Sequence, residues 1–150
     1  MQPYITGIHH ITAIAGNAQQ NIDFYTGILG LRLVKKTINF DAPDVYHFYF
    51  GDELGRPGTV FTTFPFTGAR KGIKGTGELT YTAFSIGKDS LEYWKERLKK
   101  FGIAVSDVLT RFGDSLIRFE DHDGMGIELV ANDQDDRPGW TYGQIPAEHS

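Results

Sequence analysis

The stretch that decides the fold is Gly7-Ile8-His9-His10-Ile11-Thr12-Ala13-Ile14, near the start of the chain. Its alternation of apolar and polar residues predicts a β-strand. A helix is expected directly after it, because Asn17 offers a side-chain oxygen as N-cap and Gly30 supplies a left-handed stop. Two histidines therefore lie on the predicted first strand. They are either packed core residues, or one of them is the first ligand of a metal site.

The same order of elements occurs twice along the chain. Three strand-like runs follow the first helix, and a second helix, from Asp89 to Gly102, repeats the spacing between cap and glycine. The predicted strands are 5–14, 31–40, 45–50 and 59–65 in the first half, and 78–86, 104–111, 115–120 and 126–131 in the second. We predict an α+β fold of two βαβββ units, whose curved mixed sheets surround a cleft.

The domain boundaries follow from this repeat. Residues 1–131 are predicted to form a single domain, with units at 1–66 and 78–131. The segment 67–77 is rich in glycine and basic residues and is predicted to link the units. Residues 132–150 are polar, and we expect them to be a tail or a linker to a second domain.

Composition narrows the function. The 150 residues carry a net charge of −4 without a large basic cluster, which argues against a nucleic-acid-binding surface. There is no cysteine, so a metal would be held by imidazole and carboxylate, the ligands that suit Fe(II), Mn, Ni, Co or Zn. No apolar run has a length near the ~20 residues that span a bilayer, and no signal-peptide pattern opens the chain. A cytoplasmic protein without membrane partners is expected.

His10 and Glu128 are the candidate metal ligands. Adjacent strand residues point to opposite faces, so we expect one of His9 and His10 to face the cleft and the other to face a helix or a neighbouring unit. Alignment of the two units places His10 opposite Tyr81. Glu128 interrupts an apolar strand, where an unpaired buried carboxylate would cost several kcal/mol and a metal cation would remove that cost. The alternative is that its face of the sheet is solvated.

Aromatic side chains are the candidate walls of a pocket. The predicted strand 45–50 carries Tyr46, His47 and Phe48, and either of its faces could line the cleft. Phe61 and Tyr81 are further candidates. Aromatic strands are more often core than binding site, so these residues indicate no more than an apolar ligand that includes an aromatic ring.

Several of these features together resemble a known family. The paired βαβββ units, the first-strand histidine, the Asp-x-Asp-Gly turn at 121–124 and Gly-Ile-Glu-Leu at 126–129 resemble the vicinal oxygen chelate superfamily over residues 5–131. This superfamily includes glyoxalase I, fosfomycin-resistance proteins and extradiol dioxygenases. The runs 46–55 and 145–149 are more narrowly similar to the amino-terminal domain of hydroquinone-type ring-cleaving dioxygenases.

The resemblance implies a function and a cofactor. It implies an Fe(II) centre of two histidines and one carboxylate, with Mn, Ni, Co or Zn as other choices, which opens hydroquinone- or catechol-like rings with O₂. His10 matches the first-strand ligand, while the two remaining positions hold Tyr81 and Glu128. The hydroquinone-type enzymes contain two such domains, and this chain resembles the first.

A partner is therefore expected. The chain would pair with a second homologous domain, or form a homodimer in which His10 of one copy faces Tyr81 and Glu128 of the partner subunit. Two alternatives remain: a glyoxalase-type lyase or transferase on the same scaffold, and a non-catalytic dimeric binding module with a degenerate site and no metal in the isolated chain.

Overall fold

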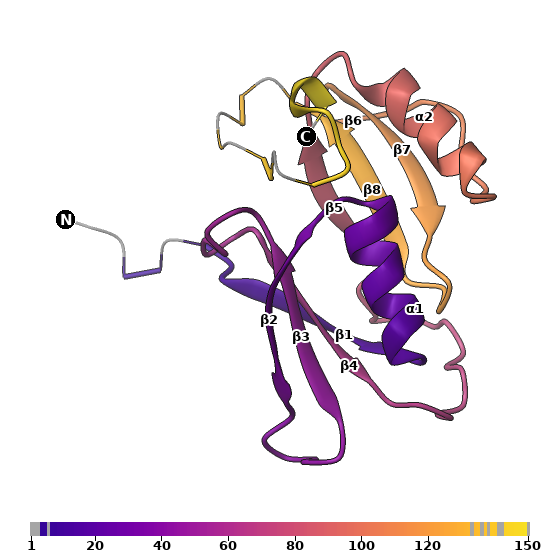
Figure 1. The fold of residues 1–150 in the computed structure, drawn as a ribbon. Helices are drawn as coiled ribbons and strands as arrows, with labels where there is room; N and C mark the ends of the chain where they lie inside the picture. The colour runs from indigo at the N-terminus through magenta and orange to yellow at the C-terminus, as the bar shows by residue number, and fades with distance from the viewer. Residues whose placement is uncertain are drawn as a thin grey trace.

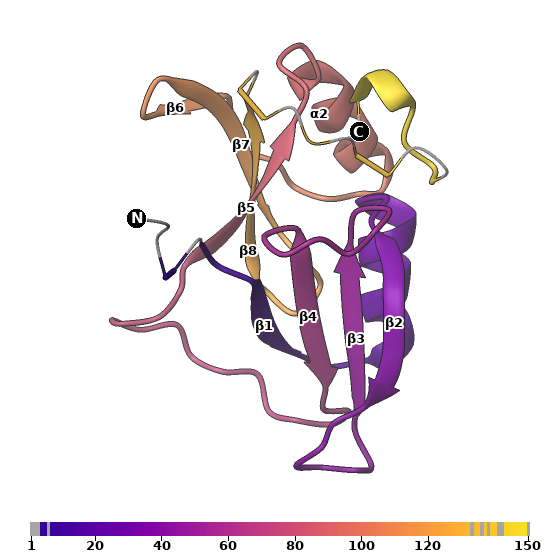
Figure 2. The same cartoon turned by 90° about the vertical axis from the view of Figure 1, so that its left-hand side faces the viewer.

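Two four-stranded sheets with helices packed on them make up the described part of the chain in the computed structural model (Figures 1 and 2). The structure describes residues 4, 5, 7–132, 134, 135, 137, 139, 140 and 143–149. The first unit comprises β1 (His10–Ala15), α1 (Ala18–Ile22), the π-helical η1 (Asp23–Ile28), β2 (Arg32–Ile38), β3 (Tyr46–Gly51) and β4 (Val60–Pro65). The second comprises β5 (Tyr81–Ile86), α2 (Leu91–Lys100), β6 (Leu109–Arg111), β7 (Asp114–Glu120) and β8 (Gly126–Ala131), and the short η2 (Ala147–His149) follows. The predicted α+β fold of two βαβββ units is confirmed.

The two sheets have the same topology. Their strand orders are β1-β4-β3-β2 and β5-β8-β7-β6, and in both the first and last strands of the unit pair in parallel. His10 lies opposite Val60 and Tyr81 lies opposite Gly126, so both residues open the first strand of their unit. His10 and Tyr81 thus occupy equivalent positions, as the alignment of the two units predicts.

Local signals explain the first helix, while tertiary contacts shift the second. Asn17 Oδ1 accepts hydrogen bonds from the backbone N–H groups of Gln19 and Gln20, both at 3.0 Å, and Gly30 ends the element with a φ of +72°. The second helix begins after Ser90 rather than after the predicted cap Asp89. Ser90 Oγ lies 3.1 Å from His149 Nδ1, so its hydroxyl contacts the C-terminal segment instead of capping the helix.

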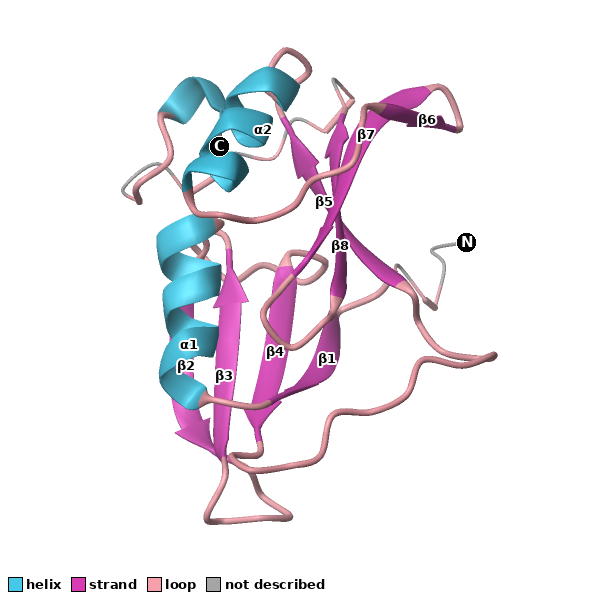
Figure 3. Cartoon of the chain, turned by 90° about the vertical axis from the view of Figure 1, so that its right-hand side faces the viewer, coloured by secondary structure: helices cyan, strands magenta, loops and turns pink. Residues whose placement is uncertain are grey.

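One hydrophobic core joins the two units. The helices lie on the same side of the sheets, as Figure 3 shows. Tyr25 packs on Phe61 at a ring-centroid distance of 4.9 Å, and Phe61 meets Phe84 of the second unit at 6.1 Å. Arg97 of α2 donates to the backbone carbonyl oxygens of Gly27 and Ile28 over 2.7 and 2.8 Å. The helices are therefore held together by polar bonds as well as by the core.

The described part of residues 132–150 packs against the helices. Ile145 is buried above Gly30, where an added Cβ would lie 2.2 Å from Ile145 Cγ1. The His149 ring stacks on Tyr93 at 4.1 Å, and the Trp94 indole N–H donates to the His149 carbonyl oxygen over 3.1 Å. The link to a second domain stays a prediction. In the part of the chain that the structure describes, no helix has the length and apolarity needed to cross a membrane.

Candidate functional site

The first sheet has a helix face and an open face. Phe61 packs on Tyr25 and so faces the helix, which turns its neighbour Thr62 to the open face. Thr62 Oγ1 lies 2.8 Å from Thr12 Oγ1, so Thr12 shares that face. His10 is two residues before Thr12 on the same strand and is exposed there. The predicted first-strand ligand therefore lies at the edge of the open face.

His9 orients the ring of His10. The Nδ1 atoms of the two residues are 3.1 Å apart, and the rings meet edge to face with centroids 5.2 Å apart. The strand begins at His10, so the strict alternation expected for the pair does not extend to His9, which is exposed rather than packed on a helix. The contact engages Nδ1 and leaves Nε2 of His10 as the nitrogen for a metal, an arrangement typical of metal-binding histidines.

His47 lies on the same open face. Its Nδ1 is 2.9 Å from the Tyr49 hydroxyl, and its ring packs on Phe64 with centroids 4.1 Å apart. Burial, followed by the nearby charges of His10 and Lys35, lowers the pKa of His47 from its ordinary value. His47 is therefore a neutral imidazole at neutral pH, close enough to His10 to respond to its charge.

The other aromatic candidates of strand β3 lie elsewhere. Phe48 is fully buried in the core on the helix face, so it cannot line a pocket on the face that carries His10. Tyr46 shares the side of Phe48, stacks on it at 5.5 Å and takes Lys36 Nζ over its ring at 4.4 Å. Strand alternation thus places Tyr46 and Phe48 on the helix face and His47 on the open face. The sequence alone did not decide which of these faces lines a pocket.

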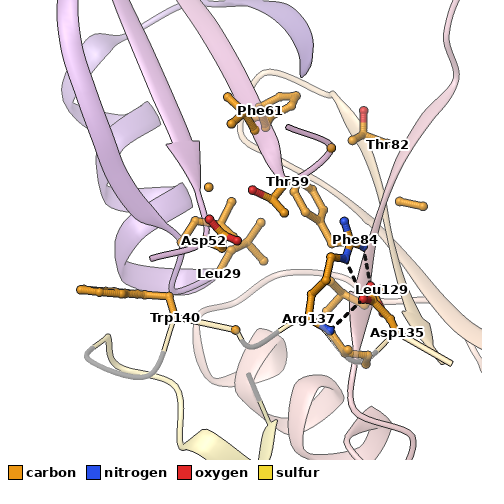
Figure 4. Close-up of a pocket in the computed structure, with 18 of the residues that line it drawn as sticks. Leu29, Asp52, Thr59, Phe61, Thr82, Phe84, Leu129, Asp135, Arg137 and Trp140 are labelled. Atoms are coloured by element: carbon orange, nitrogen blue, oxygen red, sulfur yellow. Dashed lines mark hydrogen bonds and ion pairs between the residues drawn. The ribbon is translucent and has the colours of Figure 1, made fainter. Parts of the chain in front are cut away.

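A cavity of about 360 Å³, drawn in Figure 4, is lined by residues of both units. His10 is one of its lining residues. Its walls are mostly apolar, with residues from both units and from the C-terminal segment: Leu29, Phe61, Phe84, Trp94, Leu129 and Trp140. The Thr82 hydroxyl lines it, buried and without a hydrogen-bond partner in the described structure. Phe61 is a predicted pocket residue that lines this cavity. The other predicted pocket residues, which are Tyr46, His47, Phe48 and Tyr81, are not among its lining residues.

An ion pair stands at the rim of the cavity. Arg137 Nε donates to Asp135 Oδ1 over 2.7 Å, and Figure 4 shows the two side chains together. The hydrogen bond from Arg137 lowers the pKa of Asp135 to about 2. A pair that is ionised at neutral pH therefore borders an otherwise apolar cavity, which suits a ligand that is apolar with a polar edge.

Glu128 lies on the open face of the second unit and is 2% exposed. Arg118 Nε donates to its Oε1 over 2.9 Å, and Arg111 pairs with its Oε2. Both carboxylate oxygens are thus engaged by guanidinium groups, and a metal bound there would stand beside two fixed positive charges. The residues around Glu128 do not fit a metal ligand, whereas the free Nε2 of His10 does.

The turn between β7 and β8 joins the units in a way that the sequence did not reveal. Asp121 Oδ2 accepts from the Tyr25 hydroxyl over 2.9 Å, and Asp123 Oδ2 accepts from the Gly16 N–H, also over 2.9 Å. Asp121, His122 and Asp123 are close enough to share an ion, and in the described residues they form the one such group of three donors. Since these carboxylates already hold the units together, we assign the turn a structural role. His122 is exposed, as expected.

The two predicted metal ligands, His10 and Glu128, therefore lie on separate units, each with a predicted pocket residue beside it on the same face. His10 and His47 occupy the open face of the first, and Tyr81 and Glu128 that of the second. Among the described residues, no group of three donor side chains includes His10. A metal at His10 would therefore need ligands beyond those that the described residues bring together around it.

Comparisons with known proteins show the family to which the chain belongs. The model of the Glyoxalase/Bleomycin resistance protein/Dioxygenase superfamily matches residues 7–129. The Bacillus subtilis (strain 168) protein named "Putative ring-cleaving dioxygenase MhqO" is 46% identical over 139 residues, which are 93% of this chain and 44% of that protein. A chlorohydroquinone/hydroquinone 1,2-dioxygenase of Sphingobium indicum is 41% identical over 96% of this chain and 46% of its own length. The chain thus spans less than half the length of these relatives.

Solved structures also include proteins with the fold of this chain. A Bacillus subtilis protein described as a "putative dioxygenase" superposes with a TM-score of 0.90 and 44% identity, over 96% of this chain and 46% of that one. The fosfomycin resistance protein FosX from Listeria monocytogenes superposes with a TM-score of 0.64 at 20% identity, covering 85% of this chain and 93% of its own. The similarity to FosX, at this low sequence identity, shows a shared fold only.

Proposed function

Because this chain belongs to the Glyoxalase/Bleomycin resistance protein/Dioxygenase superfamily, we propose that it forms one half of a metal-dependent dioxygenase that opens hydroquinone- or catechol-like rings with O₂. The observation that carries the proposal is His10: an exposed imidazole at the head of the first strand, with Nδ1 engaged and Nε2 free. The relatives named as ring-cleaving dioxygenases are longer than this chain, and the match covers 44% and 46% of their lengths, which supports the proposal of one half of an enzyme.

Membership of this family implies a metal cofactor, for which we propose Fe(II), with Mn, Ni, Co or Zn as other choices. His10 supplies one ligand, and a second homologous domain or a second copy of the chain supplies the others. The metal would supply the Lewis acidity and the electron transfer that ring opening with O₂ requires. We also propose that the enzyme is cytoplasmic.

The chain's own residues prepare the site for an aromatic substrate. His9 fixes the ring of His10, which keeps Nε2 directed outward. His47, neutral and bonded to Tyr49, provides a polar but uncharged wall on the same face. The apolar cavity beside His10 has the size of small-molecule sites, roughly 300 Å³ or more. In this proposal the two histidines prepare the imidazole on the open face, and the cavity, with Phe61 in its wall, offers an apolar site that reaches His10.

Substitution of His10 tests the proposal. The protein is purified as its host makes it, and metal content and hydroquinone-dependent O₂ uptake are measured for the wild type and His10→Ala. We expect His10→Ala to lose the metal and the activity, and His9→Ala to lower metal affinity by roughly 10–100-fold. Asp44→Ala is the control, since this exposed carboxylate lies outside the donor group at 121–123.

Other results would contradict the proposal. Metal retained at the wild-type level in His10→Ala would remove His10 from the site. Turnover of a glutathione hemithioacetal without hydroquinone-dependent O₂ uptake would point to a glyoxalase-type lyase instead. Tight binding of an aromatic compound by metal-free protein, without turnover, would indicate a binding module.

A further inference from the structure

One side chain from each strand of the second sheet joins a single cluster. Glu128 of β8 pairs with Arg118 of β7 and with Arg111 of β6. The Arg118 guanidinium carbon also lies 4.6 Å from the ring centroid of Tyr81, on β5. We call these four residues the transverse cluster. It spans the full width of the sheet on the open face.

The backbone is adapted to this cluster at Gly126. An added Cβ at Gly126 would lie 2.7 Å from Tyr81 Cδ1 and 2.3 Å from the Thr80 carbonyl oxygen. The Tyr81 ring therefore lies against bare backbone, where it receives the guanidinium on its face. A side chain at residue 126 would displace the ring, so the glycine is part of the arrangement.

We propose that the guanidinium of Arg118 takes the place of a metal ion in the second unit. The second unit would then correspond to the first unit in fold but bind no metal, because its own side chains pair with one another at that position. Arg118 contacts both Tyr81 and Glu128, the residues at the two remaining ligand positions. Arg111 takes the second oxygen of Glu128 and completes the pairing. With the function proposed above as premise, the metal centre of the assembly involves His10 and not Glu128.

Unequal exposure makes the cluster testable. Glu128 is 2% exposed, while the side chains of Arg111 and Arg118 are 43% and 37% exposed. If Glu128 is removed, the arginines can turn to water. If the arginines are removed, a buried carboxylate is left without its partners, which is the costlier loss. A metal ligand would behave differently, because its removal would change stability only when metal is present.

The experiment compares melting temperatures in EDTA and in excess MnCl₂. Arg111→Met/Arg118→Met is expected to lower Tm by on the order of 10 °C. Glu128→Met alone should cost less, and adding it to the double variant should restore most of the lost Tm. All these shifts should be equal in EDTA and in MnCl₂. Lys74→Met is the matched control: it breaks the exposed Lys74–Glu120 pair and should leave Tm nearly unchanged.

Two results would overturn the inference. A triple variant no more stable than the double would show that Glu128 does not depend on the arginines. A MnCl₂-dependent rise in Tm that Glu128→Met abolishes would make Glu128 a metal ligand. The metal content of His10→Ala separates this inference from the proposed function: metal retained there, together with rescue by Glu128→Met, would reject the function and keep the cluster.

Discussion

The hydroxyl of Tyr25 in the first unit donates to Asp121 Oδ2 in the second over 2.9 Å, within the buried interior. Ninety-six residues separate the two side chains along the chain. Asp121 Oδ1 accepts in addition from the backbone N–H groups of Asp123 and Met125, at 2.9 and 2.8 Å. The contact ties helix η1 to the β7–β8 turn and thereby sets one unit against the other.

Removal of the Tyr25 hydroxyl should weaken this connection. In Tyr25→Phe, Asp121 keeps its backbone donors but loses one donor to Oδ2, so we expect the free energy of unfolding to fall by about 1.5–3 kcal/mol. Urea unfolding followed by circular dichroism measures the loss. Tyr46→Phe, at a partly exposed position, should change stability by less than about 0.5 kcal/mol. Equal effects of the two substitutions would contradict a special role for the Tyr25 bond.

The same pair predicts a loss of stability in alkali. Burial first, and Asp121 second, raises the pKa of Tyr25 well above 10. The folded state therefore keeps a proton that the unfolded chain releases above pH ~10, and the stabilisation is lost as pH rises beyond that value. Between pH ~10 and the folded pKa, the wild type should lose up to about 1.4 kcal/mol per pH unit more than Tyr25→Phe. Parallel pH profiles of the two proteins would exclude Tyr25 as the cause.

The ion pair at the cavity rim predicts the opposite dependence in acid. The pKa of Asp135 is lowered from 3.8 to about 2, so its stabilisation is complete above the ordinary value and is lost as pH falls towards 2. Because Arg137 is about half exposed, solvent screening limits the contribution to about 1–2 kcal/mol. Asp135→Asn should show this deficit at pH ~6 and none near pH 2. Asp44→Asn, at an exposed site, serves as control, and a deficit that persists at pH 2 would point to lost packing instead.

Gly126 should tolerate no side chain. An alanine Cβ would approach the Thr80 carbonyl oxygen and the Tyr81 ring at distances that real Cβ atoms do not adopt. We expect Gly126→Ala to reduce the free energy of unfolding by about 1–3 kcal/mol. Gly75→Ala is the matched control, since nothing lies within 4 Å of its Cβ position, and it should be neutral within about 0.5 kcal/mol. Tyrosine fluorescence should change in Gly126→Ala, because the Tyr81 ring is displaced, and should not change in Gly75→Ala.

Local signals account for most of what the sequence predicted of the fold. The cap at Asn17, the stop at Gly30 and the alternation of the strands depend on neighbouring residues, so the βαβββ order could be predicted directly. The start of α2 could not, because Ser90 bonds to His149, a residue distant in sequence. Tertiary contacts moved that boundary by one residue.

The site was less predictable, since it depends on partners far along the chain. The carboxylate in an apolar strand indicated that Glu128 needs a cation, and the sequence predicted a metal ion as this cation. The sequence could not show that Arg111 and Arg118 supply it, because their strands pair only in the folded sheet. Nor could it decide which face of β3 joins His10, and Phe48 proved to be core while His47 lies on the open face.

The parallel pairing of first and last strands also orders the folding of each unit. His10 meets Val60 fifty residues later, so β1 has no hydrogen-bonded strand neighbour in the described sheet until the rest of its unit has been made. Closing such a loop costs chain entropy before the parallel contacts repay it, which makes this pairing slow relative to the β2–β3 hairpin. The imidazole proposed to receive the metal thus stands on the strand that docks late, and metal capture at His10 would report the completion of folding rather than initiate it.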